Sequence, residues 1–332
     1  MDRSAFALAV GCEPPVAHWF AVVDQLAAEL PDLHATDWTR RRRAARELSD
    51  LMAMRFTQLA PIDCELTEYQ VPTRAGEVTV LRYHPVGGER PRPAHLSLHG
   101  GGFVIGSVRE IINERLLRRR AVDSGVDIFA AEYRLAPEHP FPAALDDCVD
   151  VLTWLASSAD ELGIDRDRIG IGGASAGGNL AALVAVHARD HGGPHLDHQL
   201  LEVPAASLNI ADDESFRAYG ALEADIAEAC AIYLAGNAPG WSAPNDVPDL
   251  ADLPPALVIT AECDPLRDSG ETYAARLAAA GVPVRAWRAP AQAHGSAAIT
   301  RSSATAREWQ DRASGFLRAR VRETHNVLTR PR

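Results

Sequence analysis

The feature that most constrains the fold is the segment Gly173-Ala174-Ser175-Ala176-Gly177-Gly178, which directly follows the apolar run of residues 168–172. A buried strand followed at once by G-x-S-x-G is typical of a nucleophile elbow, a very tight turn that carries a serine from a strand into a helix. Small residues are required around the serine, because Cβ atoms there would collide with neighbouring backbone. The motif is short enough to arise in an ordinary Gly- and Ala-rich turn, so the rest of the chain has to decide its meaning.

The hydrophobic pattern predicts an α/β protein. Residues 65–71 and 77–83 predict a β-hairpin, and from residue 94 onward strand-like and helix-like segments alternate. Strands separated by helices of this length imply parallel crossovers and a doubly wound sheet. The predicted strands are residues 94–98, 126–133, 168–172, 199–203, 256–261 and 284–288; the predicted helices are residues 111–122, 143–155, 179–189, 222–234, 271–280 and 305–321, with further helical pattern over residues 17–60 interrupted near Pro31.

Composition excludes some functions. The net charge of −12 argues against a nucleic-acid partner, because phosphate binding needs a basic face. The five cysteines are scattered and form no C-x-x-C pair, as expected in a reducing compartment. The apolar run of residues 5–10 is too short for insertion, and no run approaches the roughly 18 apolar residues of a membrane span. We therefore expect a cytoplasmic protein with no membrane partner.

A glycine-rich segment, His99-Gly100-Gly101-Gly102-Phe103, follows the predicted strand of residues 94–98. Acyl transfer places negative charge on the carbonyl oxygen, and N–H groups fixed where that charge develops lower the barrier. Glycines allow backbone N–H groups to face a pocket without obstruction by side chains. The amides of Gly101, Gly102 and Ala176 are therefore the candidate oxyanion-hole donors.

A candidate acid and a candidate base follow the last two predicted strands. Asp264 follows the predicted strand of residues 256–261 and is the preferred acid to orient an imidazole, with Asp268 the expected capping or pairing residue and Glu262 a weaker rival. His294 lies just past the last strand. The order Ser175, Asp264, His294 is that of α/β-hydrolase triads, and the carboxyl ends of strands in such a sheet meet at one edge.

Other histidines fit the chemistry less well. His99 heads the glycine segment, which suggests a role in the architecture of that loop. His191, His195, Asp197 and His198 crowd one loop, but their spacing suits no usual structural zinc site and the loop is expected at the opposite edge of the sheet. We therefore expect neither a metal nor an organic cofactor.

Together these residues resemble the bacterial hormone-sensitive-lipase family of α/β-hydrolases, over roughly residues 75–320. The resemblance is carried by His99 to Phe103, the elbow at Ser175, Asp264-Pro265-Leu266-Arg267-Asp268, His294-Gly295 and Tyr133-Arg134-Leu135-Ala136-Pro137-Glu138-His139-Pro140-Phe141-Pro142-Ala143-Ala144.

The resemblance implies a mostly parallel, eight-stranded sheet with a helical cap. Residues 1–60 and about 207–240 would contribute the cap, and residues 61–325 would form the catalytic domain. His139 would be a packing residue. Members mostly hydrolyse esters of short to medium acyl chains without a cofactor, so the resemblance implies a small-molecule ester as substrate, and a homodimer is expected on the same ground.

Three positions depart from the family pattern. Ala174 stands where an Asp most often precedes the nucleophile, Ser296 where an aromatic residue commonly follows His-Gly, and Glu202-Val203-Pro204 where a Tyr-Pro pair usually ends the strand. None of these changes removes a catalytic group, but all three are expected near the pocket, where they would affect substrate preference.

The leading hypothesis is therefore a serine carboxylesterase. The alternative keeps the site but makes the protein a biosynthetic acyltransferase or a lyase that eliminates a carboxylate, as in secondary metabolism. A third class, a small-molecule receptor on this fold, conflicts with the presence of all three triad residues.

Overall fold

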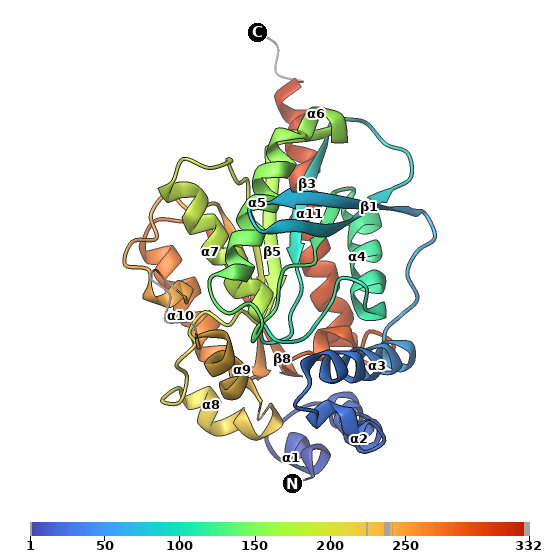
Figure 1. Cartoon of the computed structure of the whole chain (residues 1–332). Coiled ribbons are helices and arrows are strands. Elements are labelled where there is room, and N and C mark those ends of the chain that lie inside the picture. Colours follow the sequence, from blue (N-terminus) through green and yellow to red (C-terminus); the bar gives the residue numbers. More distant parts are fainter. Residues whose placement is uncertain (1, 224, 236–239, 241, 329–332) are drawn as a thin grey trace.

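The computed structural model describes residues 2–223, 225–235, 240 and 242–328. Its centre is an eight-stranded sheet in the order β1-β2-β4-β3-β5-β6-β7-β8 (Figure 1). Strand β2 is antiparallel to both β1 and β4, and the other neighbouring pairs are parallel. The fold is thus the mostly parallel α/β sheet that the sequence predicts. The strands are β1 (Cys64–Thr73), β2 (Gly76–Pro85), β3 (Arg92–Leu98), β4 (Asp127–Ala131), β5 (Ile164–Ala174), β6 (Gln199–Glu202), β7 (Ala256–Cys263) and β8 (Val284–Ala293).

Helices cover both faces of the sheet, which buries the apolar side chains of the parallel strands on both sides. On one face α4 (Ile111–Ser124) and α11 (Ala304–Leu328) pack on a cluster that includes Leu117, Ile128 and Trp309. On the other face α5 (Ala143–Ser157), α7 (Ala176–Asp190) and α10 (Arg267–Ala279) pack on a larger cluster. A short helix, α6 (Ala159–Leu162), precedes β5.

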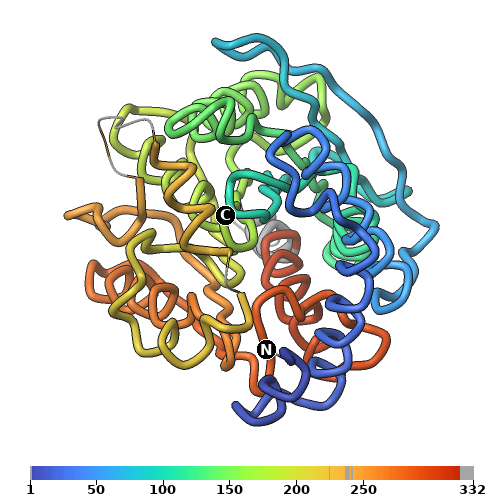
Figure 2. Tube along the Cα trace, turned by 60° about the horizontal axis from the view of Figure 1, so that its bottom comes forward, coloured from blue at the N-terminus to red at the C-terminus, as the bar shows by residue number. Residues whose placement is uncertain are grey.

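The remaining helices gather at the carboxyl ends of the parallel strands. They are α1 (Arg3–Ala9), α2 (Pro14–Ala28) and α3 (Trp38–Phe56) from the N-terminal part, and α8 (Glu214–Tyr219) and α9 (Ile226–Tyr233) from the segment after β6. Figure 2 shows the first group in blue along one side of this end and the second group in yellow along the other. The two groups touch where Arg3 of α1 donates to the backbone oxygen of Leu222, at 3.2 Å.

The sequence-based element assignments agree with the structure at the strands and differ at several helices. The sequence pattern did not predict α1, and the helix predicted over residues 222–234 begins only at Ile226, after a short 3-10 turn (Gly220–Leu222). The prediction that His139 packs in the interior is wrong, because its side chain is exposed; Tyr133 and Phe141 from the same motif are buried instead.

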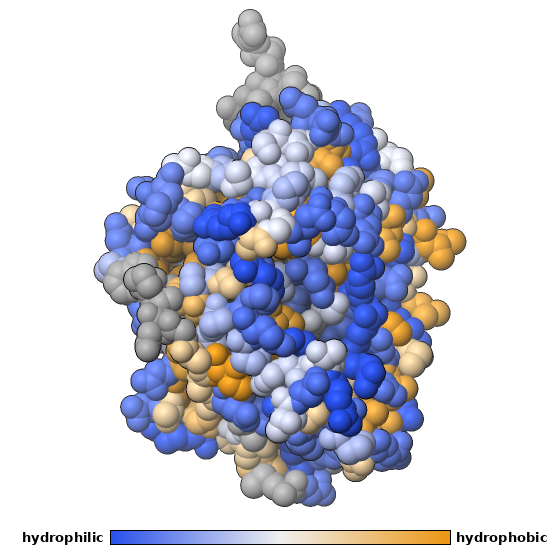
Figure 3. Space-filling model, in the orientation of Figure 1, coloured by the Kyte–Doolittle hydropathy of each residue, from blue (hydrophilic) through white to orange (hydrophobic). Residues whose placement is uncertain are grey.

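The surface gives little sign of a large apolar patch. Figure 3 shows a mostly hydrophilic face, with small apolar groups along its right-hand edge, where the chain runs from α3 to β1. Exposed large apolar side chains in this part include Leu59 and Ile62. None of the described helices is both long enough and apolar enough to cross a lipid bilayer.

Two buried histidines lie side by side within the sheet. His95 on β3 and His198, just before β6, stack with ring centroids 5.2 Å apart. His95 Nδ1 lies 3.1 Å from His198 Nε2, and His198 Nδ1 lies 2.9 Å from Asp197 Oδ2. Gly170 on the intervening strand makes room, since a Cβ there would lie 2.1 Å from the His198 ring. Burial lowers the pKa of both imidazoles, so both rings are held neutral.

We therefore expect the free energy of unfolding to fall as the pH drops below about 6.5, the pKa of an unfolded histidine. Below that pH the unfolded chain binds protons at both imidazoles, whereas the folded chain does not until its lowered pKa values are reached. Each imidazole contributes a slope of up to about 1.4 kcal/mol per pH unit. Urea unfolding between about pH 8 and about pH 5, followed by circular dichroism, measures the slope.

The variant His95→Gln should show a shallower slope than the parent protein, because one of the two proton-linked groups is gone. His139→Gln, which removes an exposed imidazole, is the matched control and should keep the parent slope. A His95→Gln protein with an unchanged slope would contradict the assignment.

Candidate active site

Ser175 lies on a strained turn between β5 and α7. Its backbone angles are φ 56° and ψ −117°, a region that L-residues rarely adopt. The turn fits only because its neighbours are glycines: a Cβ on Gly173 would lie 2.5 Å, and one on Gly177 2.1 Å, from the backbone oxygen of Leu98. These contacts explain the small residues of the G-x-S-x-G motif. The strain presents the Ser175 hydroxyl above the end of the sheet, at the N-terminus of a helix.

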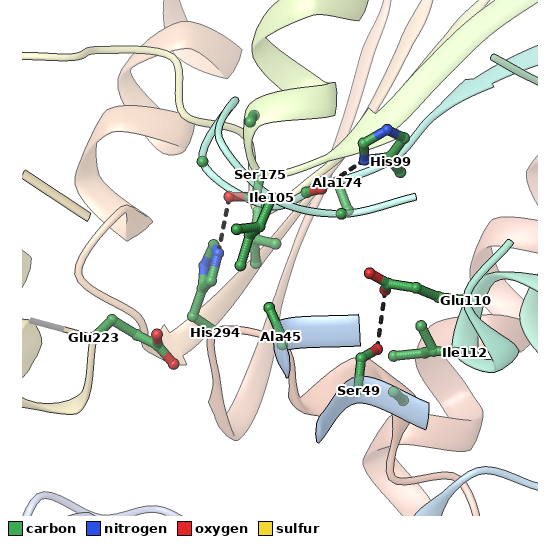
Figure 4. A pocket seen from close by; sticks show the side chains of 18 of the residues that line it. Ala45, Ser49, His99, Ile105, Glu110, Ile112, Ala174, Ser175, Glu223 and His294 are labelled. Atoms are coloured by element: carbon green, nitrogen blue, oxygen red, sulfur yellow. Dashed lines mark hydrogen bonds between the residues drawn. The ribbon is translucent and has the colours of Figure 1, made fainter. Parts of the chain in front are cut away.

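The structure brings Ser175, His294 and Asp264 into one chain of hydrogen bonds (Figure 4 shows the serine and the histidine). His294 Nε2 lies 3.0 Å from Ser175 Oγ, and His294 Nδ1 lies 2.9 Å from Asp264 Oδ2. The second oxygen of Asp264 accepts from the backbone N–H of Leu266 at 2.7 Å, which fixes the carboxylate. The three residues directly follow β5, β7 and β8, so their meeting is a consequence of the parallel sheet.

The other sequence candidates for the acid do not reach the histidine. Asp268 accepts from the backbone N–H of Ser215 at 2.8 Å and pairs with Arg267. Glu262 accepts from the backbone N–H of Ala291 at 2.7 Å. Asp268 therefore joins α10 to α8, and Glu262 joins β7 to β8.

The electrostatics at His294 favour the imidazolium. Burial lowers the pKa of His294, but the adjacent Asp264 and, more weakly, Glu223 outweigh burial and raise the pKa to about 9. Such a group is protonated at neutral pH in the free protein. Base catalysis through it would therefore gain strength as the pH rises.

The glycine segment after β3 places free N–H groups beside the serine. Gly101 and Gly102 have φ values of 120° and 60°. Within the described ranges, their N–H groups and that of Ala176 donate to no protein acceptor. A Cβ on Gly101 would lie 2.1 Å from the oxygen of Ile105, so the loop needs glycine there. Three donors left free beside a nucleophile suit a developing oxyanion.

His99 serves the architecture of this loop. Its ring stacks on Tyr133 with centroids 4.2 Å apart, and its Nδ1 lies 2.8 Å from the oxygen of Gly100. The Tyr133 hydroxyl donates to the backbone oxygen of His99 at 2.6 Å. Burial lowers the pKa of His99, which keeps it neutral.

The loop histidines do not assemble a metal site in the described part of the chain. His198 is engaged with His95 and Asp197, and His191 stacks on His187 with centroids 4.1 Å apart. No group of three His, Cys, Asp or Glu side chains with metal-binding geometry occurs among the residues that the structure describes.

The three departures from the family pattern occupy different surroundings. Glu202 is buried and forms a two-bond ion pair with Arg120 of α4, at 2.7 and 3.0 Å, while Trp309 Nε1 donates to it at 2.8 Å. Ser296 is buried away from the pocket, and its hydroxyl is 2.8 Å from both Gln292 Oε1 and the oxygen of Ala293. Ala174 and Glu202 line the cavity described next, so these two positions can affect a ligand directly.

A cavity of about 830 Å³ opens above Ser175. Its floor is the edge of the sheet, and its walls come from α2, α3, the glycine segment after β3 and α9. A Cβ on Gly102 would lie 2.8 Å from Ala229 of α9, which shows how closely this helix covers the loop. The cavity has the size and the largely apolar walls of a small-molecule site.

Two carboxylic acids in this cavity were missed from the sequence. Figure 4 shows Glu223 beside His294 and Glu110 on the opposite side of Ser175. Burial raises the pKa of each to about 7. Neither belongs to a motif, and no signal in the sequence could have found them, because they reach the site through the packing of distant segments.

Comparison with known proteins places the chain in a family. The family model described as alpha/beta hydrolase fold matches residues 95–298, more than half of the chain. The chain belongs to this family. The resemblance to the hormone-sensitive-lipase branch of the α/β-hydrolases is thereby confirmed, and the eight strands follow its mostly parallel sheet.

Relatives of this α/β-hydrolase carry esterase names. It is 40% identical over 214 residues to esterase LipI of Mycobacterium tuberculosis, an alignment that covers 61% of this chain and 65% of LipI. The match thus spans a little under two thirds of that relative. The ethyl acetate hydrolase of Pseudomonas putida is 32% identical over 85% of this chain and 90% of its own. The solved esterase of Pyrobaculum calidifontis superposes with a TM-score of 0.78 at 35% identity, covering 90% of this chain and 96% of that structure.

Proposed function

We propose that the protein is a serine carboxylesterase that hydrolyses esters of short to medium acyl chains. The observation that carries the proposal is the chain of hydrogen bonds from Ser175 through His294 to Asp264, with unused backbone donors beside it. The esterase names of the relatives support the reaction class.

In the proposed mechanism, Ser175 Oγ attacks the ester carbonyl while its proton moves to His294 Nε2. The N–H groups of Gly101, Gly102 and Ala176 hold the oxyanion, and Asp264 stabilises the imidazolium. His294 then gives the proton to the leaving alcohol, and an acyl-serine forms. Water then attacks the acyl-serine while His294 takes its proton, and His294 returns that proton to Ser175 Oγ as the carboxylic acid leaves.

The helical segments above the site would act as a cap. Residues 1–60 and the described part of residues 207–240 supply cavity-lining side chains such as Trp19, Met52 and Leu222. They bury the substrate and exclude water, while the sheet supplies the chemistry. The segment 61–325 would then be the catalytic domain.

The proposal is tested by following acyl-enzyme formation. The purified protein is mixed with 4-nitrophenyl acetate, butyrate and octanoate, and nitrophenolate release is recorded before and during steady state. We expect turnover of all three, fastest for the shorter chains, and intact-protein mass spectrometry should find one acyl group on a quenched sample. Slow release with no acylated protein would contradict the proposal and favour an acyltransferase or a lyase with one specific substrate. No observation on the structure favours that alternative at present.

The charge of Glu223 should shift the pH range in which this activity rises. Because catalysis needs the neutral imidazole, kcat/KM should rise with pH through the pKa of His294, about 9. In that range Glu223, with a pKa of about 7, is ionised and stabilises the imidazolium. Removing its charge in Glu223→Gln should shift the rising limb to lower pH by about half a unit to one unit.

The profile is measured with 4-nitrophenyl butyrate, corrected for spontaneous hydrolysis at each pH. Glu214→Gln removes an exposed carboxylate from the same capping segment and should leave the limb in place. An unshifted limb in Glu223→Gln would show that its charge does not act on His294.

A further inference from the structure

The carboxyl group of Glu110 lies in the cavity without an ion-pair partner among the described residues. Glu110 directly precedes α4, and its Oε2 accepts from the hydroxyl of Ser49 on α3 at 2.9 Å. Among the described residues no other side chain hydrogen-bonds this carboxyl group, and none forms an ion pair with it. Figure 4 shows the two residues facing each other across the wall of the cavity, with Ala45 and Ile112 nearby.

The position of Glu110 relative to His294 indicates that Glu110 lies on the side of Ser175 where the acyl chain of an ester would bind. In ester hydrolysis the imidazole gives its proton to the leaving alcohol, so the alcohol lies on the His294 side of Ser175. Figure 4 places His294 on one side of Ser175 and Glu110 on the other. The acyl chain of a bound ester would therefore run past apolar residues toward Glu110.

The surroundings of Glu110 are negative. Asp50 Oδ1 accepts from the N–H of Ile111 at 2.7 Å, and Glu132 Oε2 accepts from the N–H of Val108 at 2.6 Å. Arg46, a cation near this carboxyl group, lies 3.7 Å from Asp50 and donates to the oxygen of Arg109 at 2.8 Å. Burial is the largest cause that raises the pKa of Glu110 to about 7, and Asp50 and Glu132 add to it; the hydrogen bond from Ser49 and the charge of Arg46 act in the opposite direction without outweighing them.

A cationic ligand would relieve this imbalance. An ammonium group placed between Glu110 and the acyl chain would form a charge-assisted hydrogen bond with the carboxylate in a water-poor space. A hydroxyl group could donate the same bond but would not neutralise the charge. The structure therefore favours the ammonium group.

We propose that the acyl pocket takes esters whose acyl chain ends in an ammonium group, with Glu110 as the specificity-determining carboxylate and Ser49 as the residue that positions it. The inference rests on the proposed esterase function and names the substrate class for that site.

The test uses two matched sets of three 4-nitrophenyl esters that differ only in the last group of the chain. One set is the 6-aminohexanoate, 6-hydroxyhexanoate and heptanoate, and the longer set is the 8-aminooctanoate, 8-hydroxyoctanoate and nonanoate; the unsubstituted butyrate reports the basal activity. For each ester kcat and KM are measured below pH 9, where the amine is protonated, with the spontaneous reaction subtracted.

In the parent protein we expect kcat/KM for the ammonium ester to exceed that for the isosteric alkyl ester in at least one set. Glu110→Gln should reduce this ratio about tenfold, mainly through KM; because both esters are measured on the same variant, a general loss of activity cancels from the ratio. Ser49→Ala should reduce the ratio less, because the carboxylate keeps its charge but loses its fixed orientation. Glu114→Gln, in the first turn of α4 and with its carboxylate paired to Arg118, is the matched control and should leave the ratio unchanged.

A ratio that is the same in Glu110→Gln as in the parent protein would overturn the proposal. So would a Glu110-dependent preference for the hydroxyl ester over the ammonium ester, since that result would mean a neutral donor in the subsite. Failure of the parent protein to hydrolyse butyrate or heptanoate would instead count against the proposed esterase function, so the two failures are distinguishable.

Discussion

Replacing Ser175 by alanine is expected to lower kcat for 4-nitrophenyl butyrate by about 10⁴- to 10⁶-fold. The variant keeps the oxyanion donors and the cavity but has no atom that can form the acyl intermediate, so only a small residual acceleration remains. Alanine fits the turn as serine does, because the only atom removed is Oγ, which lies 3.0 Å from His294 Nε2. The loss should therefore come without unfolding, which a thermal melt of the variant checks.

The matched control is Ser302→Ala, which removes a hydroxyl bonded at 3.4 Å to the oxygen of Ile299, away from the elbow. It should retain the parent rate. Equal rates for the parent protein and Ser175→Ala would mean that Ser175 is not the nucleophile, and the esterase proposal would fall with it.

Asp264→Asn is expected to lower kcat by about 10⁴-fold. Asparagine fills the same space but offers an amide in place of a carboxylate, so the imidazolium formed in the reaction is no longer stabilised. The amide can also present an N–H to His294 Nδ1, which would favour the wrong tautomer and leave Nε2 protonated toward Ser175. The measurement is kcat with 4-nitrophenyl butyrate across the pH range in which the parent protein is active.

Asp268→Asn provides the comparison, because this acid lies four positions along the same segment and bonds Ser215 and Arg267 instead of the histidine. We expect a change of less than about tenfold, together with some loss of stability from the broken loop contacts. If the two variants lost activity equally, Asp264 would not be the acid that orients His294.

Much of the proposed machinery could be predicted because it follows strand ends. His99, Ser175, Asp264 and His294 directly follow β3, β5, β7 and β8. Alternation of apolar strands and helices identifies those ends, and a parallel sheet brings them to one edge. The elbow could be predicted residue by residue, since the close approach of Gly173 and Gly177 to Leu98 allows no larger side chain.

The wall of the pocket could not be predicted in the same way. Glu110 and Ser49 are 61 positions apart and meet only because α3 packs beside the start of α4. Glu223 comes near His294 from the segment between β6 and β7, in which the helix starts later than its apolar pattern indicated. His139 was wrongly expected to be a packing residue. A motif shared with a family shows which residues recur, but it does not show which of them face solvent.

By itself, the sequence determined the sheet class, the strained turn at Ser175 and the candidates for acid, base and oxyanion donors. These features depend on local sterics and on short-range patterns, so residues close together in the sequence are enough to specify them. Only the tertiary structure showed that Asp264, and not its rivals, hydrogen-bonds His294. It also paired Glu202 with Arg120, and it set Glu110 and Glu223 on opposite sides of Ser175. The physical reason is that distances between side chains from distant segments, and the burial and charge they create for one another, exist only once the helices have packed on the sheet.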